Sequence, residues 1–175
     1  MPAVNPSPLD PLRRIFGERL EALAGAVVAA EVPLTTELVN RLIAEKLAAS
    51  GAPVTSAEVV VLENDSFTVH VRPRAPLPML RVDVVIDRQP DWPAQPMLGM
   101  RWTLRGLGPL ALLAAPVMAY LKKLPAGVRM DGDRLWVNVE EILRQRGLGE
   151  IVPLLTGIRV TTRERRFVVA FELRR

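Results

Sequence analysis

The run of residues from 107 to 121 contains no charged side chain, and it restricts the fold more than any other feature of the sequence. Every face of a helix formed by such residues is apolar, so protein, lipid or ligand must cover all of it. Pro109 suits the first turn of a helix, and Pro125 suits its end. The run therefore predicts a central apolar helix from Pro109 to Lys123.

The predicted central helix is too short for a simple membrane span. Fifteen residues at about 1.5 Å per residue cover about 22 Å, whereas the hydrocarbon core of a bilayer is about 30 Å thick. Pro116 interrupts the run, and Lys122 with Lys123 ends it. Because leucine, valine and alanine recur on all sides, the helix is expected to be wrapped by other elements.

Length and composition favour one domain with a substantial core. The chain has 175 residues and is 49% hydrophobic, which is sufficient to bury a core. The first eleven residues include four prolines, so residues 1–11 are expected to be a flexible N-terminus. Residues 12–175 are then expected to form a single domain.

Charge and cysteine content restrict the function classes only weakly. The chain has no cysteine, and its 23 basic and 19 acidic residues give a net charge of +4. This surplus is compatible with phosphate headgroups or with an ordinary solvated surface. Basic residues do not alternate with aromatic ones as in single-strand binders, so nucleic acid is not expected as a partner. No signal peptide is apparent, which indicates a cytoplasmic protein, with peripheral membrane association left open.

Two helices are expected before the first hairpin. Apolar residues at helical spacing predict one from about Asp10 to Ala29, with Asp10 as its N-cap and Pro33 separating it from the next element. Thr35 or Thr36 can cap the second, which runs through the sequence TELVNRLIAEKLAAS. Its expected buried face consists of Leu38, Val39, Leu42, Ile43 and Leu47.

From residue 54 the hydrophobic period changes to two, which is typical of strands. The pattern predicts hairpins at 58–62 with 67–72, at 127–130 with 135–139 and at 158–162 with 167–173, and further strands at 80–87 and 97–105. A short helix is expected at 139–146. The predicted fold is therefore α+β: a curved antiparallel sheet of hairpins wrapped around the central apolar helix, with two N-terminal helices.

The polar motifs do not predict catalysis or a metal site. His70 is the only histidine and lies in a strand without a second ligand or nucleophile. The sequence Asp131–Gly132–Asp133 lacks the remaining ligands of a calcium loop and reads as a hairpin turn. Asp83 and Asp87 share one face of a strand, a pattern that solvated strands often show. We therefore expect neither an enzyme nor a cofactor.

Methionine and tryptophan are concentrated in the strands that flank the predicted central helix. Such side chains line apolar ligand grooves, but they also fill ordinary cores. Both interpretations remain open from composition alone. The expected apolar ligand-binding residues are Met97, Met100, Trp102, Leu110, Leu113, Val117, Met118 and Leu121.

The order of elements resembles a known family. The segments LTTELVNRLIAEKLA and LPAGVRMDGDRLWVNVE, with strands and an apolar helix between them, are similar to bacterial members of the tubular lipid-binding superfamily, especially the small phospholipid-binding proteins of mycobacterial envelope type. The resemblance covers about Leu34 to Val139 and includes no catalytic signature. It implies a curled sheet around a helix, with an apolar channel for acyl chains. The missing secretion signal departs from the envelope members.

The sequence thus predicts non-enzymatic binding of a lipid or another long apolar ligand, in a groove between sheet and central helix. The alternative is a structural or protein-interaction domain with a filled core, which could act as a homodimer. Contact with an anionic membrane is expected through four basic residues near apolar segments, Arg72, Arg74, Lys122 and Lys123.

Overall fold

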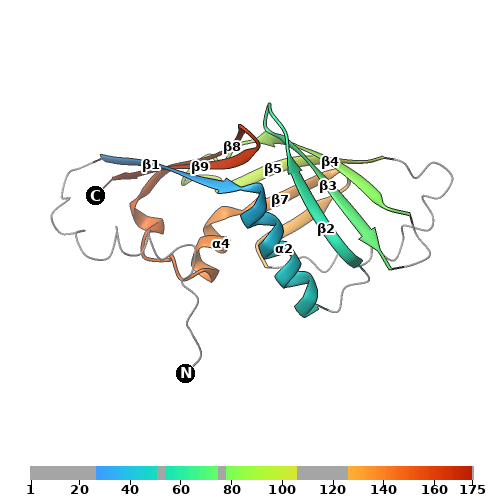
Figure 1. The fold of residues 1–175 in the computed structure, drawn as a ribbon. Coiled ribbons are helices and arrows are strands. Elements are labelled where there is room, and N and C mark those ends of the chain that lie inside the picture. The colour runs from blue at the N-terminus through green and yellow to red at the C-terminus, as the bar shows by residue number, and fades with distance from the viewer. Residues whose placement is uncertain (1–26, 51–53, 75–77, 106–125, 175) are drawn as a thin grey trace, which may run out of the picture.

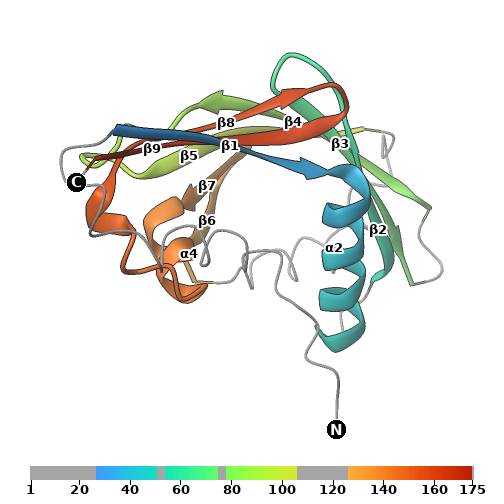
Figure 2. The ribbon, with the colours of Figure 1, turned by 60° about the vertical axis from the view of Figure 1, so that its left-hand side comes forward.

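The computed structural model describes residues 27–50, 54–74, 78–105 and 126–174, and their strands form two antiparallel sheets. Figures 1 and 2 show the helices α2 (Thr36–Ser50) and α4 (Val139–Gln145) on the same side of the strands and apart from each other. The predicted α+β class with antiparallel sheets is confirmed. The predicted central helix, 109–123, lies outside the described residues. Among the described helices, none has the length and apolar character needed to cross a bilayer.

The first described strand pairs with the last. The three-stranded sheet has the order β1 (Val27–Thr35), β9 (Arg166–Arg174), β8 (Leu155–Arg163), and Val27 lies opposite Arg174. The hairpin of β8 and β9 confirms the prediction for 158–173. This sheet therefore joins the two ends of the described chain.

The predicted first helix is wrong at its C-terminal end, because residues 27–29 belong to β1 rather than to a helix. The rest of that predicted helix, up to residue 26, lies outside the described residues. Val27 and Val28 are β-branched and suit a strand that has a partner in β9. Pro33 does not separate two elements but lies within β1. Because β1 is an edge strand, the missing N–H of Pro33 is tolerated there.

The remaining strands form a six-stranded sheet, and each was expected from the period-two pattern. Its order is β2 (Val54–Val61), β3 (Ser66–Pro73), β4 (Leu80–Arg88), β5 (Met97–Arg105), β7 (Arg134–Asn138), β6 (Val128–Asp131). The turn between β2 and β3 places Asn64 and Asp65 at φ 56° and 54°. Asparagine and aspartate tolerate this left-handed backbone better than most residues do.

Both predicted helices in the described chain are present. The Leu38 N–H donates to Thr35 Oγ1 at 3.3 Å, so Thr35 caps α2, which packs along β2. The expected buried face of α2 is only partly covered, and Leu42 is exposed. The short helix α4 is capped by Asn138, whose Oδ1 accepts from the Glu141 N–H at 3.1 Å. The 3₁₀ helix η3 (Val152–Leu154) then leads into β8.

Two side-chain amides pair with strand edges that lack a neighbouring strand. The Val59 N–H donates to Asn40 Oδ1 at 2.6 Å, and Asn40 Nδ2 donates to the Val59 carbonyl at 3.0 Å. Gln89 does the same for Val160 on β8, at 2.9 and 2.7 Å. Each amide replaces one residue of a neighbouring strand, which makes β2 and β8 less available to another chain.

The loop from Gln89 to Pro96 lies outside the sheet interior, and it connects the two sheets. In addition to the Gln89 pair, Trp92 Nε1 donates to the Leu155 carbonyl at 2.7 Å. The Trp92 ring packs against a core cluster built by α4, η3 and the three-stranded sheet. A loop that follows β4 thus fixes the position of β8.

Candidate functional site

One face of the six-stranded sheet is apolar across its central strands, and we call it the inner face. Side chains directly opposite one another on paired antiparallel strands share a face. The buried members are Val84, Ile86, Leu98 and Met100, and the half-buried ones that pack against them include Phe67, Val69, Val82, Trp102, Leu135 and Val137. Val160 of β8 also packs here. The inner face is therefore a continuous apolar surface with several incompletely covered side chains.

Trp102 introduces an unusual polar atom on the inner face. It lies opposite Val84 in the register, and its Nε1 atom is buried without a hydrogen-bond acceptor among the described residues. A buried indole N–H ordinarily has an acceptor, since leaving it unpaired costs about 1 to 3 kcal/mol. The position of Trp102 Nε1 therefore suits an apolar ligand that carries an oxygen able to accept this hydrogen bond.

The structure separates the predicted ligand-binding residues. Met100 and Trp102 lie together on the inner face. Met97 lies on the opposite face of β5, because odd and even residues of a strand point to opposite sides. The other five predicted residues, Leu110, Leu113, Val117, Met118 and Leu121, lie outside the described part of the chain.

The predicted membrane-contact residues do not form one described cluster. Arg72 lies exposed near the end of β3, and Arg74 follows it, also exposed. Arg74 borders a pocket of about 400 Å³ between α2 and β2, which Leu47 and Val54 also line. Lys122 and Lys123 lie outside the described residues.

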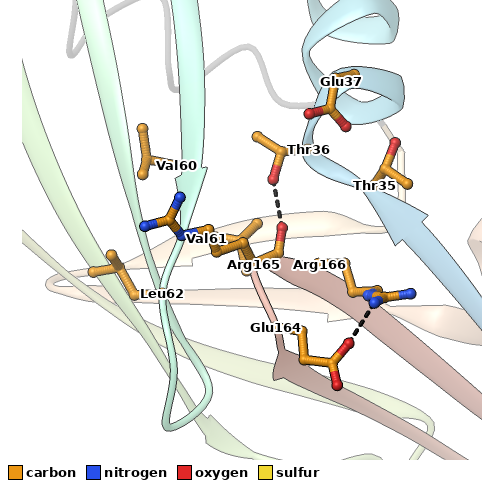
Figure 3. A pocket seen from close by; sticks show the side chains of 9 residues that line it. All are labelled: Thr35, Thr36, Glu37, Val60, Val61, Leu62, Glu164, Arg165 and Arg166. Atoms are coloured by element: carbon orange, nitrogen blue, oxygen red, sulfur yellow. Dashed lines mark hydrogen bonds and ion pairs between the residues drawn. The ribbon is translucent and has the colours of Figure 1, made fainter.

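A larger pocket of about 680 Å³ lies where the two sheets meet beside the start of α2. Figure 3 shows how one wall comes from the end of β2 and the other from the β8–β9 turn, with the first residues of α2 above. The lining residues are Thr35, Thr36, Glu37, Val60, Val61, Leu62, Glu164, Arg165 and Arg166. The turn residues Glu164 and Arg165 have φ values of 49° and 60°, as a tight hairpin turn requires.

The polar groups of this pocket are engaged with one another. Thr36 Oγ1 donates to the Arg165 carbonyl at 2.6 Å, and Arg166 pairs with Glu164. A hydrogen bond from the backbone N–H of Glu37 and a second from the Thr35 hydroxyl lower the pKa of the Glu37 carboxyl, with burial opposing them. No histidine or cysteine lines the pocket. The arrangement stabilises the junction of the sheets, and the Thr35 hydroxyl beside the Glu37 carboxylate also caps α2.

The paired carboxylates of β4 form ion pairs with arginines on the outer face, the face opposite the inner one. Asp83 Oδ1 lies 2.9 Å from Arg81 Nε, and its Oδ2 lies 2.5 Å from Arg105 Nε. The Thr68 hydroxyl also donates to Asp83 Oδ1, at 2.9 Å. Asp87 lies 3.5 Å from guanidinium nitrogens of Arg101 and Arg134. Carboxylates held in this way stabilise the sheet and are poorly suited to proton transfer.

Replacing Asp83 with asparagine is expected to remove a pH-dependent part of the stability. Burial raises the pKa of Asp83, but hydrogen bonds from Arg81 and Thr68, with the arginine charges, outweigh it and lower the pKa. The stabilisation is therefore present above about pH 4, the unfolded pKa, and is lost as the pH falls through the lower folded-state value. Denaturant titrations of the parent and Asp83→Asn should differ by about 1 kcal/mol at neutral pH and converge in acid.

Asp133→Asn is the matched control for this prediction. Its carboxylate is 66% exposed and lies 3.6 Å from Arg101 Nε, so the variant should change stability by less than about 0.5 kcal/mol at every pH. A difference between the parent and Asp83→Asn that stays constant down to acid pH would contradict the proposed linkage.

The described residues were expected to contain no cluster of metal-ligating side chains around His70. His70 lies half-buried on β3, and no group of three metal-ligating side chains occurs among these residues. The Asp131–Gly132–Asp133 segment forms the turn between β6 and β7, with Gly132 at φ +57°. The prediction of a hairpin turn is therefore confirmed.

The sequence did not indicate that Trp136 would lie at the centre of an arginine cluster. Trp136 lies opposite Gly99, and the guanidinium carbons of Arg88, Arg129 and Arg134 lie 5.7, 6.0 and 5.7 Å from its ring centroid. The signal in the sequence was Gly99, because a glycine in the middle of a strand often marks the close approach of another group.

No family model, curated protein or solved structure matches the chain.

Proposed function

We propose that the protein binds a lipid or another long apolar ligand on the inner face, without catalysis. The observation that carries this proposal is the buried, unpaired Nε1 of Trp102 within an apolar surface. A ligand with an acyl chain and an ester or carboxylate oxygen supplies both the apolar contact and the missing acceptor.

Two further features support this proposal. Several inner-face side chains, including Phe67, Val82 and Leu135, are only half-buried and can gain apolar contact from a ligand. The sequence from 107 to 121 is uncharged and also needs an apolar environment. The resemblance to tubular lipid-binding proteins is consistent with a channel between such parts.

An enzymatic function has less support. Asp83 and Asp87 pair with arginines, and in the pocket of Figure 3 the Thr35 hydroxyl is engaged as the cap of α2. The main competitor is the alternative already given by the sequence, a structural or interaction domain whose core is filled. That alternative requires no bound lipid.

The proposal is tested by measuring lipid binding with a variant at Trp102. Organic extraction and mass spectrometry of the purified parent should release acyl lipids. Trp102→Phe should remain folded, since it retains an aromatic ring and removes an unpaired N–H. In a titration with anthroyloxy-palmitate, its affinity should fall by about tenfold, the usual value of one hydrogen bond.

Trp136→Phe is the control, because it makes the same change on the outer face. It should bind the fatty acid like the parent. Parent protein that yields no lipid and does not bind the probe would favour the filled core. Unchanged affinity in Trp102→Phe would show that the indole N–H is not the ligand's donor.

A further inference from the structure

A row of side chains crosses four strands on the outer face, and it contains two arginines, a tryptophan and a glycine. Arg88 of β4 lies opposite Gly99 of β5, Gly99 lies opposite Trp136 of β7, and Trp136 lies opposite Arg129 of β6. The two guanidinium carbons lie 5.7 and 6.0 Å from the Trp136 ring centroid. These distances are typical of cation–π contacts. We call this set the Arg–Trp row.

Gly99 provides the space that the Trp136 ring occupies in the row. A Cβ atom at position 99 would lie 2.9 Å from both Trp136 Cζ3 and Arg88 Cβ, closer than carbon atoms approach. The indole therefore lies against the backbone of β5, with Arg88 beside it. Because the sheet register fixes both neighbours, the arginines are held near the ring before any ligand arrives.

The two arginines of the row lack carboxylate partners within the described residues. Arg88 Nη2 donates to the neutral amide oxygen of Gln95, and Arg129 makes no ion pair in this part of the chain. Asp87 lies between this row and the adjacent one, because its Oδ1 is 3.3 Å from the position that a Cβ atom at residue 99 would take. Arg134 pairs with Asp87, and Asp131 lies opposite Arg134. Arg88 and Arg129 therefore make no ion pair among the described residues, and the nearby Asp87 carboxylate is already shared by Arg101 and Arg134.

We propose that the Arg–Trp row docks the protein on the surface of an anionic phospholipid bilayer, with Arg88 and Arg129 binding headgroup phosphates. Guanidinium groups bind phosphate through paired hydrogen bonds, and tryptophan favours the interface between headgroups and acyl chains. Nucleic acid fits less well, because one indole held against a sheet does not provide successive stacking platforms. The inference rests on the proposed function, since a protein that binds lipid has to meet the membrane that supplies or receives it.

This row differs from the membrane contact expected from the sequence. Arg72 and Arg74 lie at the end of β3, and Arg74 borders the pocket between α2 and β2. Neither lies in the cross-strand row of Trp136. The two surfaces can therefore be separated by mutation.

The experiment compares vesicle binding of Arg88→Gln/Arg129→Gln with that of Arg41→Gln/Arg159→Gln. The control removes the same charge from exposed positions on α2 and β8 that make no ion pair within the described chain. Co-sedimentation uses phosphatidylcholine vesicles with and without phosphatidylglycerol, at low and high salt. A basic group near an anionic surface contributes roughly fivefold to binding, so the row variant should lose about 25-fold, and the control should bind like the parent.

Several results would overturn the inference. One is equal binding by the row variant and the parent, and another is equal binding of the parent to neutral and anionic vesicles. A third result concerns free phosphate. If inorganic phosphate abolishes vesicle binding and chloride at the same ionic strength does not, the row is a site for free phosphate. Stronger binding to a single-stranded oligonucleotide than to vesicles, lost in the row variant, would assign the surface to nucleic acid.

The folding of both variants is checked by thermal unfolding, and Trp136→Phe provides a second test. That variant keeps the two charges and should weaken vesicle binding by a smaller factor than the double arginine variant.

Fatty-acid binding in solution without vesicles separates this inference from the proposed function. If the row variant binds anthroyloxy-palmitate normally and vesicles poorly, both proposals are supported. If no protein binds the fatty acid but vesicle binding still depends on the row, only the proposed function fails.

Discussion

Trp92→Ala is expected to destabilise the protein by about 3 kcal/mol, near the lower end of the range for truncating a core aromatic residue, because Trp92 is half-buried. Two losses combine in this variant. The ring leaves the cluster that contains Leu155 and Leu173, and the Leu155 carbonyl loses the indole donor at 2.7 Å. Denaturant unfolding monitored by circular dichroism measures the effect.

Trp92→Phe separates the two losses. The phenyl ring retains most of the apolar contact and lacks the N–H, so this variant should lose about 1 kcal/mol, the usual contribution of one hydrogen bond. Hydrogen exchange provides a local readout, since amides of β8 should lose protection more than those of β3. If Trp92→Ala changed stability by less than about 1 kcal/mol, the loop would not hold the two sheets together.

Gly99→Ala is expected to destabilise the protein by about 1 to 3 kcal/mol, the range found for overpacking. The added Cβ would lie 2.9 Å from Arg88 Cβ and from a ring carbon of Trp136. The first contact involves an atom attached directly to the backbone of β4, so relief requires movement of a strand or displacement of the indole. Thermal and denaturant unfolding measure the loss, and the tryptophan emission should change as the ring shifts.

Gly149→Ala is the matched control for Gly99→Ala. A Cβ there would meet Arg144 Cγ at 3.8 Å, an ordinary contact, so its effect should stay within about 0.5 kcal/mol. If Gly99→Ala is as stable as Gly149→Ala and has unchanged emission, Trp136 does not depend on the space above Gly99. The Arg–Trp row would then not be held in advance by the sheet register.

The hydrophobic pattern was sufficient to predict most described elements. In β4, apolar residues alternate with charged or exposed ones from Leu80 to Arg88, and one face is buried as expected. The sequence TELVNRLIAEKLAAS predicted α2 because its helical spacing and its N-terminal threonine act within a few residues. Local patterns of this kind are readable because each residue's neighbours along the chain determine them.

The predicted site was recovered less completely. Met100 and Trp102 lie together because they are two residues apart on one strand. Met97 was grouped with them by composition, although strand periodicity assigns it to the other face. The apolar residues predicted between 110 and 121 lie outside the described residues, so the predicted groove between sheet and helix stays a prediction.

The sequence by itself determined the class of the fold, most of its strands and turns, and the absence of cysteine chemistry, because all of these depend on residue type and short-range order. Only the tertiary structure decided that β1 pairs with β9, that Trp92 binds β8, and that Trp136 lies over Gly99 between arginines. These contacts join residues far apart in the chain, and many alternative pairings would satisfy the same local pattern. Strand register and packing select among them, and neither is encoded in any single segment.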